Sequence, residues 1–124
     1  MKFVGWFWIT LLFFLVACGQ SAPPPTATLD PQVTEGKRVF SQNCGSCHAI
    51  DPETVIVGPS LAGVAGRAET RIVGVSGRDY LLQSILNPEA YLVEGFDKLM
   101  PTDFGKRLTG EELDALMAYL FTIQ

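Results

Sequence analysis

Two cysteines and the only histidine of the chain stand together in Cys44-Gly45-Ser46-Cys47-His48. This C-x-x-C-H spacing is typical of the covalent attachment of a c-type haem. Two thiols so spaced on a tight turn can add to the two vinyl groups of the porphyrin, while the next residue directs an imidazole at the iron. The motif therefore predicts one covalent haem c, attached through Cys44 and Cys47 and ligated by His48.

Two other interpretations of this motif stay open. A C-x-x-C pair in an oxidising compartment can exchange thiols and disulfides, although such pairs generally follow a strand, and no strand is expected before Cys44. A structural zinc ion needs about four nitrogen or sulfur ligands, whereas this region offers only Cys44, Cys47 and His48. Haem attachment is favoured over both.

The composition leaves few residues that could be the second axial ligand of such an iron. A single histidine excludes bis-histidine ligation within one chain. Of the three methionines, Met1 opens the chain and Met117 falls on the apolar face of a predicted helix, where packing is the usual role. Met100 precedes a proline that keeps its loop out of regular structure, so we expect its thioether to bind the iron. If Met100 merely fills apolar space, the iron keeps an open position for small molecules.

Helical signals surround these residues, and no segment shows a convincing alternation of apolar and polar residues. Thr34 predicts the cap of a short helix that runs to about Gln42. Ser76 or Gly77 starts a second helix, from Arg78 to Leu86, and Asn87-Pro88 ends it.

The last predicted helix has the clearest start. Thr109-Gly110-Glu111-Glu112 has the pattern of a capping box. The apolar residues that follow recur at helical spacing on one face: Leu113, Leu116, Met117 and Leu120. Glycines and prolines between residues 49 and 76 predict loop, with a loose helical turn from Leu61 to Ala68. The fold class is therefore expected to be all-α, with about three main helices and loops wrapped around one covalent haem.

The N-terminus carries an apolar run, Phe3 to Val16, after Lys2. The run is shorter than the roughly 20 residues of a membrane-spanning helix and has the layout of a cleavable secretory signal. Its end, Leu15-Val16-Ala17-Cys18, resembles the lipobox of bacterial lipoproteins, whose cysteine is acylated. We expect a signal peptide at 1–17 and a lipid on Cys18; an uncleaved signal anchor would also hold the domain at a membrane.

Composition and charge then divide the rest of the chain. Residues 18–32, which include Pro23-Pro24-Pro25, are expected to be a tether, and 33–124 a single domain.

The net charge of the chain bears on its partners. Removal of residues 1–17 takes away Lys2 and no acid, so the formal charge of −4 becomes −5. An acidic chain without a basic run argues against nucleic acid as a partner. Lys98, Lys106 and Arg107 flank Met100 and are either a local basic docking rim or ordinary solvated charges.

From about Val33 to its end the chain resembles class I cytochromes c. The matching features come in that family's order: Gly36 and Phe40, the C-x-x-C-H motif, Gly58-Pro59-Ser60-Leu61, the segment Tyr80 to Pro88, Met100-Pro101 and Tyr119-Leu120. The resemblance implies that the carbonyl of Pro59 accepts a hydrogen bond from His48, and that Leu61 packs on the haem face. It also implies that Gly36 lets the first and last helices cross closely, beside Phe40 and Tyr119.

The stretch from Tyr80 to Met100 is similar to cytochrome c domains fused to, or bound by, bacterial terminal oxidases and quinol-oxidising complexes. This similarity implies a respiratory setting. Ligation by His48 and Met100 would raise the reduction potential and fill both axial positions of the iron, so we expect a high-potential electron carrier and not an enzyme. We expect a membrane-anchored monohaem cytochrome of a respiratory or photosynthetic chain, at the periplasmic or extracytoplasmic face of a bacterial membrane. Its redox partners would be a quinol-oxidising complex, a terminal oxidase or a reaction centre. A fixed subunit of such a complex is the alternative.

Overall fold

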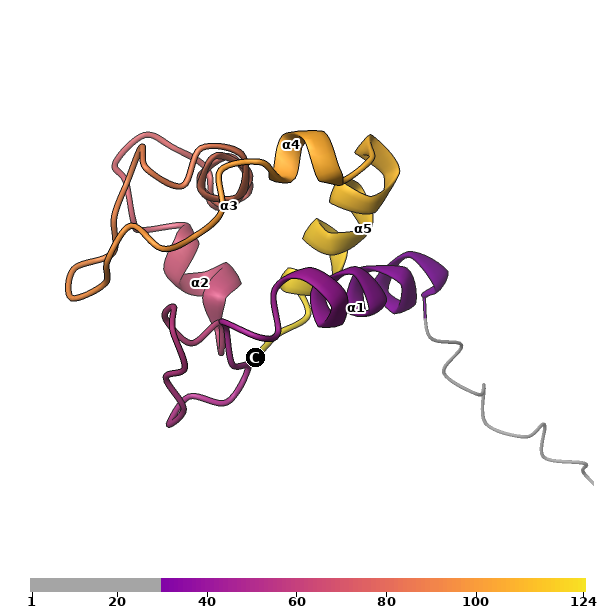
Figure 1. The fold of residues 1–124 in the computed structure, drawn as a ribbon, viewed down its shortest axis with the longest axis horizontal. Helices are drawn as coiled ribbons and strands as arrows, with labels where there is room; N and C mark the ends of the chain where they lie inside the picture. The colour runs from indigo at the N-terminus through magenta and orange to yellow at the C-terminus, as the bar shows by residue number, and fades with distance from the viewer. Residues whose placement is uncertain (1–29) are drawn as a thin grey trace, which may run out of the picture.

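All regular structure in the computed structural model, which describes residues 30–124, is helical (Figure 1). The helices are α1 (Pro31–Asn43), α2 (Val64–Ala68), α3 (Gly77–Leu86), α4 (Phe104–Arg107) and α5 (Gly110–Leu120). No strand forms between residues 30 and 124, and the predicted all-α class is confirmed. None of these helices has the length and apolar character needed to cross a membrane. The predicted signal peptide, Cys18 and the tether up to residue 29 lie outside the described residues.

Helix α1 begins earlier than the sequence predicted. The carboxylate of Asp30 accepts a hydrogen bond from the backbone N–H of Gln32 at 2.8 Å, and Pro31 takes the first helical position. Proline suits that position because its missing N–H would have no partner there. The backbone N–H of Thr34 already bonds to the carbonyl of Asp30 at 2.9 Å, so the predicted cap at Thr34 was wrong. Pro31 and Gln32, which the composition assigned to the tether, belong to the helix.

The two later caps are confirmed. The hydroxyl of Ser76 accepts from the N–H of Asp79 at 3.1 Å and starts α3. At α5 the hydroxyl of Thr109 accepts from the N–H of Glu112 at 3.1 Å, and the Glu112 carboxylate accepts from the N–H of Thr109 at 3.0 Å. These reciprocal bonds satisfy donors that every helix start leaves free. The predicted turn near α2 is a five-residue helix, and α4 was not predicted.

Helices α1 and α5 cross at close range, as the resemblance implied. A Cβ atom at Gly36 would overlap the carbonyl oxygen of Ala115 and would lie 2.7 Å from the Cβ of Tyr119. The rings of Phe40 and Tyr119 pack beside the crossing with their centroids 5.5 Å apart. The absence of a side chain at Gly36 is therefore what allows the two backbones to approach.

In Figure 1, α2 and α3 lie on the left of the view and α1 and α5 on the right, with α4 at the top next to the start of α5. Helix α3 packs against α2 and α4 and also contacts α5. The predicted inner face of α5 is confirmed, because Leu116, Met117 and Leu120 are buried and Leu113 is half-buried. Two long loops, residues 44–63 and 87–103, connect the two sides and supply most of the functional residues.

Candidate functional site

A cavity of about 650 Å³ lies among the helices and is lined by residues from all five of them. Its walls are mainly apolar and include Phe40, Val64, Leu81, Ile85, Phe104, Leu116 and Leu120. The volume falls within the roughly 300–1,000 Å³ of sites that enclose organic ligands and cofactors. An apolar group of that size can be buried here.

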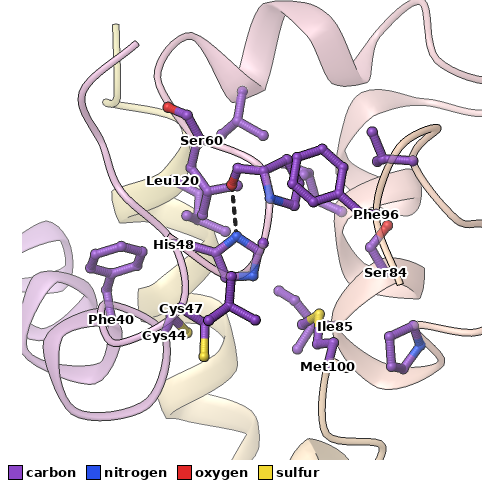
Figure 2. Close-up of a pocket in the computed structure, with 18 of the residues that line it drawn as sticks. Phe40, Cys44, Cys47, His48, Ser60, Ser84, Ile85, Phe96, Met100 and Leu120 are labelled. Carbon is purple, nitrogen blue, oxygen red and sulfur yellow. Dashed lines mark hydrogen bonds between the residues drawn. The ribbon is translucent and has the colours of Figure 1, made fainter. Parts of the chain in front are cut away.

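The C-x-x-C-H motif forms a tight turn at the end of α1. The carbonyl of Phe40 accepts from the N–H groups of Cys44 and Gly45, at 2.8 and 2.9 Å. The carbonyl of Cys44 then accepts from those of Cys47 and His48, at 3.0 and 2.9 Å. This turn brings both thiols and the imidazole to the same cavity wall (Figure 2). Both cysteines are free thiols and are half-buried.

The imidazole of His48 is fixed by the following loop. Its Nδ1 lies 2.8 Å from the carbonyl oxygen of Pro59, the dashed line in Figure 2. A carbonyl can only accept, so Nδ1 carries the proton and the lone pair of Nε2 is left for a metal. A Cβ atom at Gly58 would come 2.8 Å from Nδ1, which leaves no room for a side chain there. The N–H of Gly58 also bonds to the carbonyl of Cys47 at 2.9 Å and ties the loop to the motif.

Met100 enters the same cavity from the loop before α4. In Figure 2 its thioether lies beside Ile85 and faces the space that His48 also faces. Met100 is half-buried and packs on the core, whereas the preceding Leu99 is 66% exposed. The six residues predicted for the site are thus brought together on one cavity: Cys44, Cys47, His48, Pro59, Leu61 and Met100.

Comparison with known proteins agrees with this geometry. The family model described as Cytochrome c matches residues 33–124. The chain belongs to the cytochrome c family. Three relatives illustrate its range.

This cytochrome is 32% identical to cytochrome c type-1 of Ascaris suum over 79 residues, which cover 50% of this chain and 70% of that protein. It is 33% identical to cytochrome c 2.1 of Caenorhabditis briggsae over 70 residues, which cover 47% of this chain and 62% of that protein. It is also 31% identical over 112 residues to cytochrome c oxidase subunit 2 of Bacillus sp. (strain PS3). That match covers 85% of this chain but 30% of the oxidase subunit.

Family membership establishes haem c as the cofactor, held covalently through the C-x-x-C-H motif. The structure of this cytochrome fits that group in three respects: an apolar cavity, two free thiols on one turn, and an imidazole whose second nitrogen is already hydrogen-bonded. His48 and Met100 are the residues we expect to bind the iron.

The other interpretations of the motif find no support in the geometry. Burial raises the pKa of the Cys44 thiol to about 11, although the charge of Arg107 acts in the opposite direction. Thiols that exchange disulfides have a lowered pKa instead. Between residues 30 and 124, no three histidine, cysteine or acidic side chains converge on a point where a metal ion could be held. Among these described residues, a tetrahedral zinc site therefore lacks its ligands.

Several residues that line the cavity were not predicted from the sequence, among them Arg71, Tyr91 and Phe96. They lie in loops without a recognisable motif, so no local signal marks them. Arg107, one of the three cations considered as a docking rim, also lines the cavity. It bonds to Asn43 at 3.2 Å, pairs with Asp103 at 3.6 Å and stacks over the ring of Phe104. Lys98 and Lys106 remain exposed.

Proposed function

We propose that this cytochrome c carries single electrons in a respiratory or photosynthetic chain while anchored to the outer face of a bacterial membrane. The convergence of Cys44, Cys47, His48 and Met100 on one apolar cavity supports this proposal most directly. When bound there, haem c supplies a one-electron couple between ferric and ferrous iron.

The side chains around the cavity set the properties of this carrier. Pro59 holds the ring of His48 and raises its basicity. The thioether of Met100 favours the ferrous state, and the apolar walls disfavour the additional charge of the ferric state. The thioether and the apolar walls therefore raise the reduction potential. Because His48 and Met100 would occupy both axial positions, the protein acts as a carrier and not as an enzyme.

Spectroscopy of the purified full-length protein tests the site. We expect one haem per chain in a pyridine haemochrome assay, and colour that stays with the protein after acid-acetone extraction. Reduced protein should be oxidised by membranes that contain a terminal oxidase, and oxidised protein should be reduced by membranes with quinol-oxidising activity. Retention of haem without exchange in either direction would contradict the proposed function.

The anchor is a separate part of the proposal, and it depends on the lipobox-like sequence that ends at Cys18. Lipid on Cys18 and a proline-rich tether would keep the domain outside the cell yet let it reach a redox partner. Cys18→Ser should move the protein from the membrane to the soluble extracytoplasmic fraction without loss of haem. Ser21→Ala, close by in the same segment, should stay in the membrane.

A fixed subunit of a quinol-oxidising or terminal oxidase complex is the second candidate. The match to an oxidase subunit over 85% of this chain favours it. Purification in mild detergent separates the two: a free carrier elutes alone, whereas a subunit elutes with its complex in constant ratio.

A further inference from the structure

The loop that follows the C-x-x-C-H motif carries a group of exposed apolar side chains. Ile50, Val55, Ile56 and Val57 are between 46% and 64% exposed. They are four of the ten large apolar residues that are exposed between residues 30 and 124. Single exposed apolar residues are normal, whereas several in one short segment mark a site of interaction. We call these four residues the apolar loop surface.

The cofactor leaves most of the apolar loop surface open. Of its four residues, only Val57 is among those that line the haem cavity. The segment forms a projection below α2 in Figure 1. A haem in the cavity can therefore cover Val57 at most, and the side chains of Ile50, Val55 and Ile56 remain available to another molecule.

The loop is held in one shape by its own hydrogen bonds. The carboxylate of Asp51 accepts from the N–H of Glu53 at 2.9 Å and from the hydroxyl of Thr54 at 3.1 Å. The backbone carbonyl of Asp51 accepts from the hydroxyl of Ser60 at 2.7 Å. A surface that is ordered in advance loses little conformational entropy when a partner binds. These bonds therefore favour a role of the loop in binding.

The same loop is bonded to the place where the cofactor is attached. The backbone carbonyl of Cys47 accepts from the N–H groups of Val57 and Gly58, at 3.2 and 2.9 Å. A molecule seated on Val55 and Ile56 is therefore close to a residue that holds the edge of the haem. Contact at this place suits a partner that exchanges electrons with the cofactor.

Charge indicates what kind of partner fits. Asp51 and Glu53 are exposed beside the apolar residues, and residues 39–66 contain no lysine or arginine. Arg67 contacts the loop at Ser60, but backbone carbonyls accept from its guanidinium group and it lines the cavity. An anionic membrane surface and a second copy of this acidic chain would both be repelled. A partner with basic side chains around an apolar contact would be attracted.

We propose that the apolar loop surface is the docking site for a redox partner of this cytochrome, and that this partner presents an apolar patch edged by lysines or arginines. The inference rests on the proposed function and adds the chemistry of the partner. It differs from docking through Lys98, Lys106 and Arg107, which would select an acidic partner. Apolar contact supplies the affinity of the complex, and the surrounding charges guide the approach.

Electron exchange between the full-length holoprotein and the two kinds of membrane tests the apolar contact. Val55→Ser and Ile56→Ser should each lower the second-order rate constant about threefold to tenfold in at least one direction of exchange. Val73→Ser is the matched control, because Val73 is fully exposed in a different loop. It should keep the wild-type rate. Oxidation by ferricyanide, a small ion that needs no docking surface, should be alike in all three variants. Rates with both membranes that equal those of Val73→Ser overturn the inference.

Charge reversal tests the basic character of the partner. In Glu53→Lys the rate at low salt should fall about threefold or more, because the acid that attracts the partner becomes a repelling cation. Glu111→Lys makes the same change of net charge at the start of α5, and it should keep the wild-type rate. A rate in Glu53→Lys that equals or exceeds the rate in Glu111→Lys overturns the inference.

Two other occupants of the surface are outcomes of a binding test. The Cys18→Ser holoprotein, which cannot carry the proposed lipid, should sediment as a monomer and stay apart from vesicles of phosphatidylcholine and phosphatidylglycerol. Flotation with the vesicles that is lost on adding Val55→Ser would mean that the loop inserts into lipid. A dimer that Val55→Ser dissociates would mean that a second copy covers the loop. Either result overturns the inference.

Failure of the proposed function gives a different result. A wild-type protein that exchanges no electrons with either kind of membrane contradicts the proposed function and this inference together. A competent carrier whose Val55→Ser and Ile56→Ser variants keep the wild-type rate contradicts the docking site alone.

Discussion

At the scale of single residues, the loop after the motif controls one ligand through groups that are not ligands themselves. The carbonyl of Pro59 fixes the proton of His48 on Nδ1, and Gly58 leaves the space in which the ring stands. Neither residue has chemistry of its own. Their positions next to the ring nevertheless determine which imidazole nitrogen is free, and therefore what His48 can bind.

Met100 carries the sharpest prediction at this scale. Met100→Ala should leave haem attached through Cys44 and Cys47 but abolish the ferric absorption band that arises from sulfur bound to iron, and lower the reduction potential. The matched control is Met117→Leu, which replaces a fully buried methionine of the core by a residue of similar volume. Visible spectra of the two oxidised variants show whether Met100 is the sulfur ligand of the iron. A band that persists in Met100→Ala would refute the ligand assignment.

The sequence predicted the reactive residues of the site because their signal is local. Cys44, Cys47 and His48 lie within five consecutive positions, and Met100 stood out through the adjacent proline and the shortage of other candidates. Arg71 and Tyr91 could not be predicted in this way. They come from separate loops and share the cavity wall only because α2 and α3 fold against each other.

At the scale of helices, the start of α1 shows how composition can mislead. Asp30-Pro31 continues a proline-rich segment, and this composition indicated a tether. The same two residues are a good cap and a good first helical residue. Local signals were sufficient for α3 and α5, whose caps were predicted. They were insufficient for α4, a four-residue helix whose Phe104 is buried against distant parts of the chain.

The cap of α1 can be measured. Asp30→Ala should reduce the free energy of unfolding by about 0.5–2 kcal/mol, because the N–H of Gln32 loses its side-chain acceptor. Thr34→Ala should be neutral or slightly stabilising, since Thr34 is exposed inside the helix and alanine has the higher helix propensity. Denaturant unfolding of both holoprotein variants gives the comparison. The reverse order would place the cap at Thr34.

The crossing of α1 and α5 yields a second measurement on helices. Gly36→Ala should destabilise the protein by about 1–3 kcal/mol, because the added methyl group meets the backbone of Ala115 and must push the helices apart. Gly66→Ala in α2 is the control, because nothing lies within 4 Å of its added methyl group. That variant should be neutral or more stable by up to about 1 kcal/mol. Equal changes in both variants would show that close contact at the crossing does not decide the stability.

At the scale of the whole molecule, the helices form two groups that meet around the cofactor cavity. Helices α1 and α5 pack on each other, and α3 packs on α2 and α4 with a smaller contact to α5. The cavity is lined from both groups. A small domain of this kind buries limited apolar surface on its own, so a large apolar cofactor at the centre adds a substantial part of the core.

Loss of the cofactor should therefore separate the two groups. In the double variant Cys44→Ala with Cys47→Ala, no thioether can form, and we expect the cooperative unfolding transition to disappear. Amide hydrogen exchange should show the slowest residual exchange in α1 and α5, which keep their crossing at Gly36, and fast exchange in α3 and α4, whose inner faces meet water. The control Ser46→Ala changes an exposed residue of the same turn and should keep haem, cooperativity and uniform protection. Equal protection of all five helices in the double variant would mean that the polypeptide specifies this fold without its cofactor.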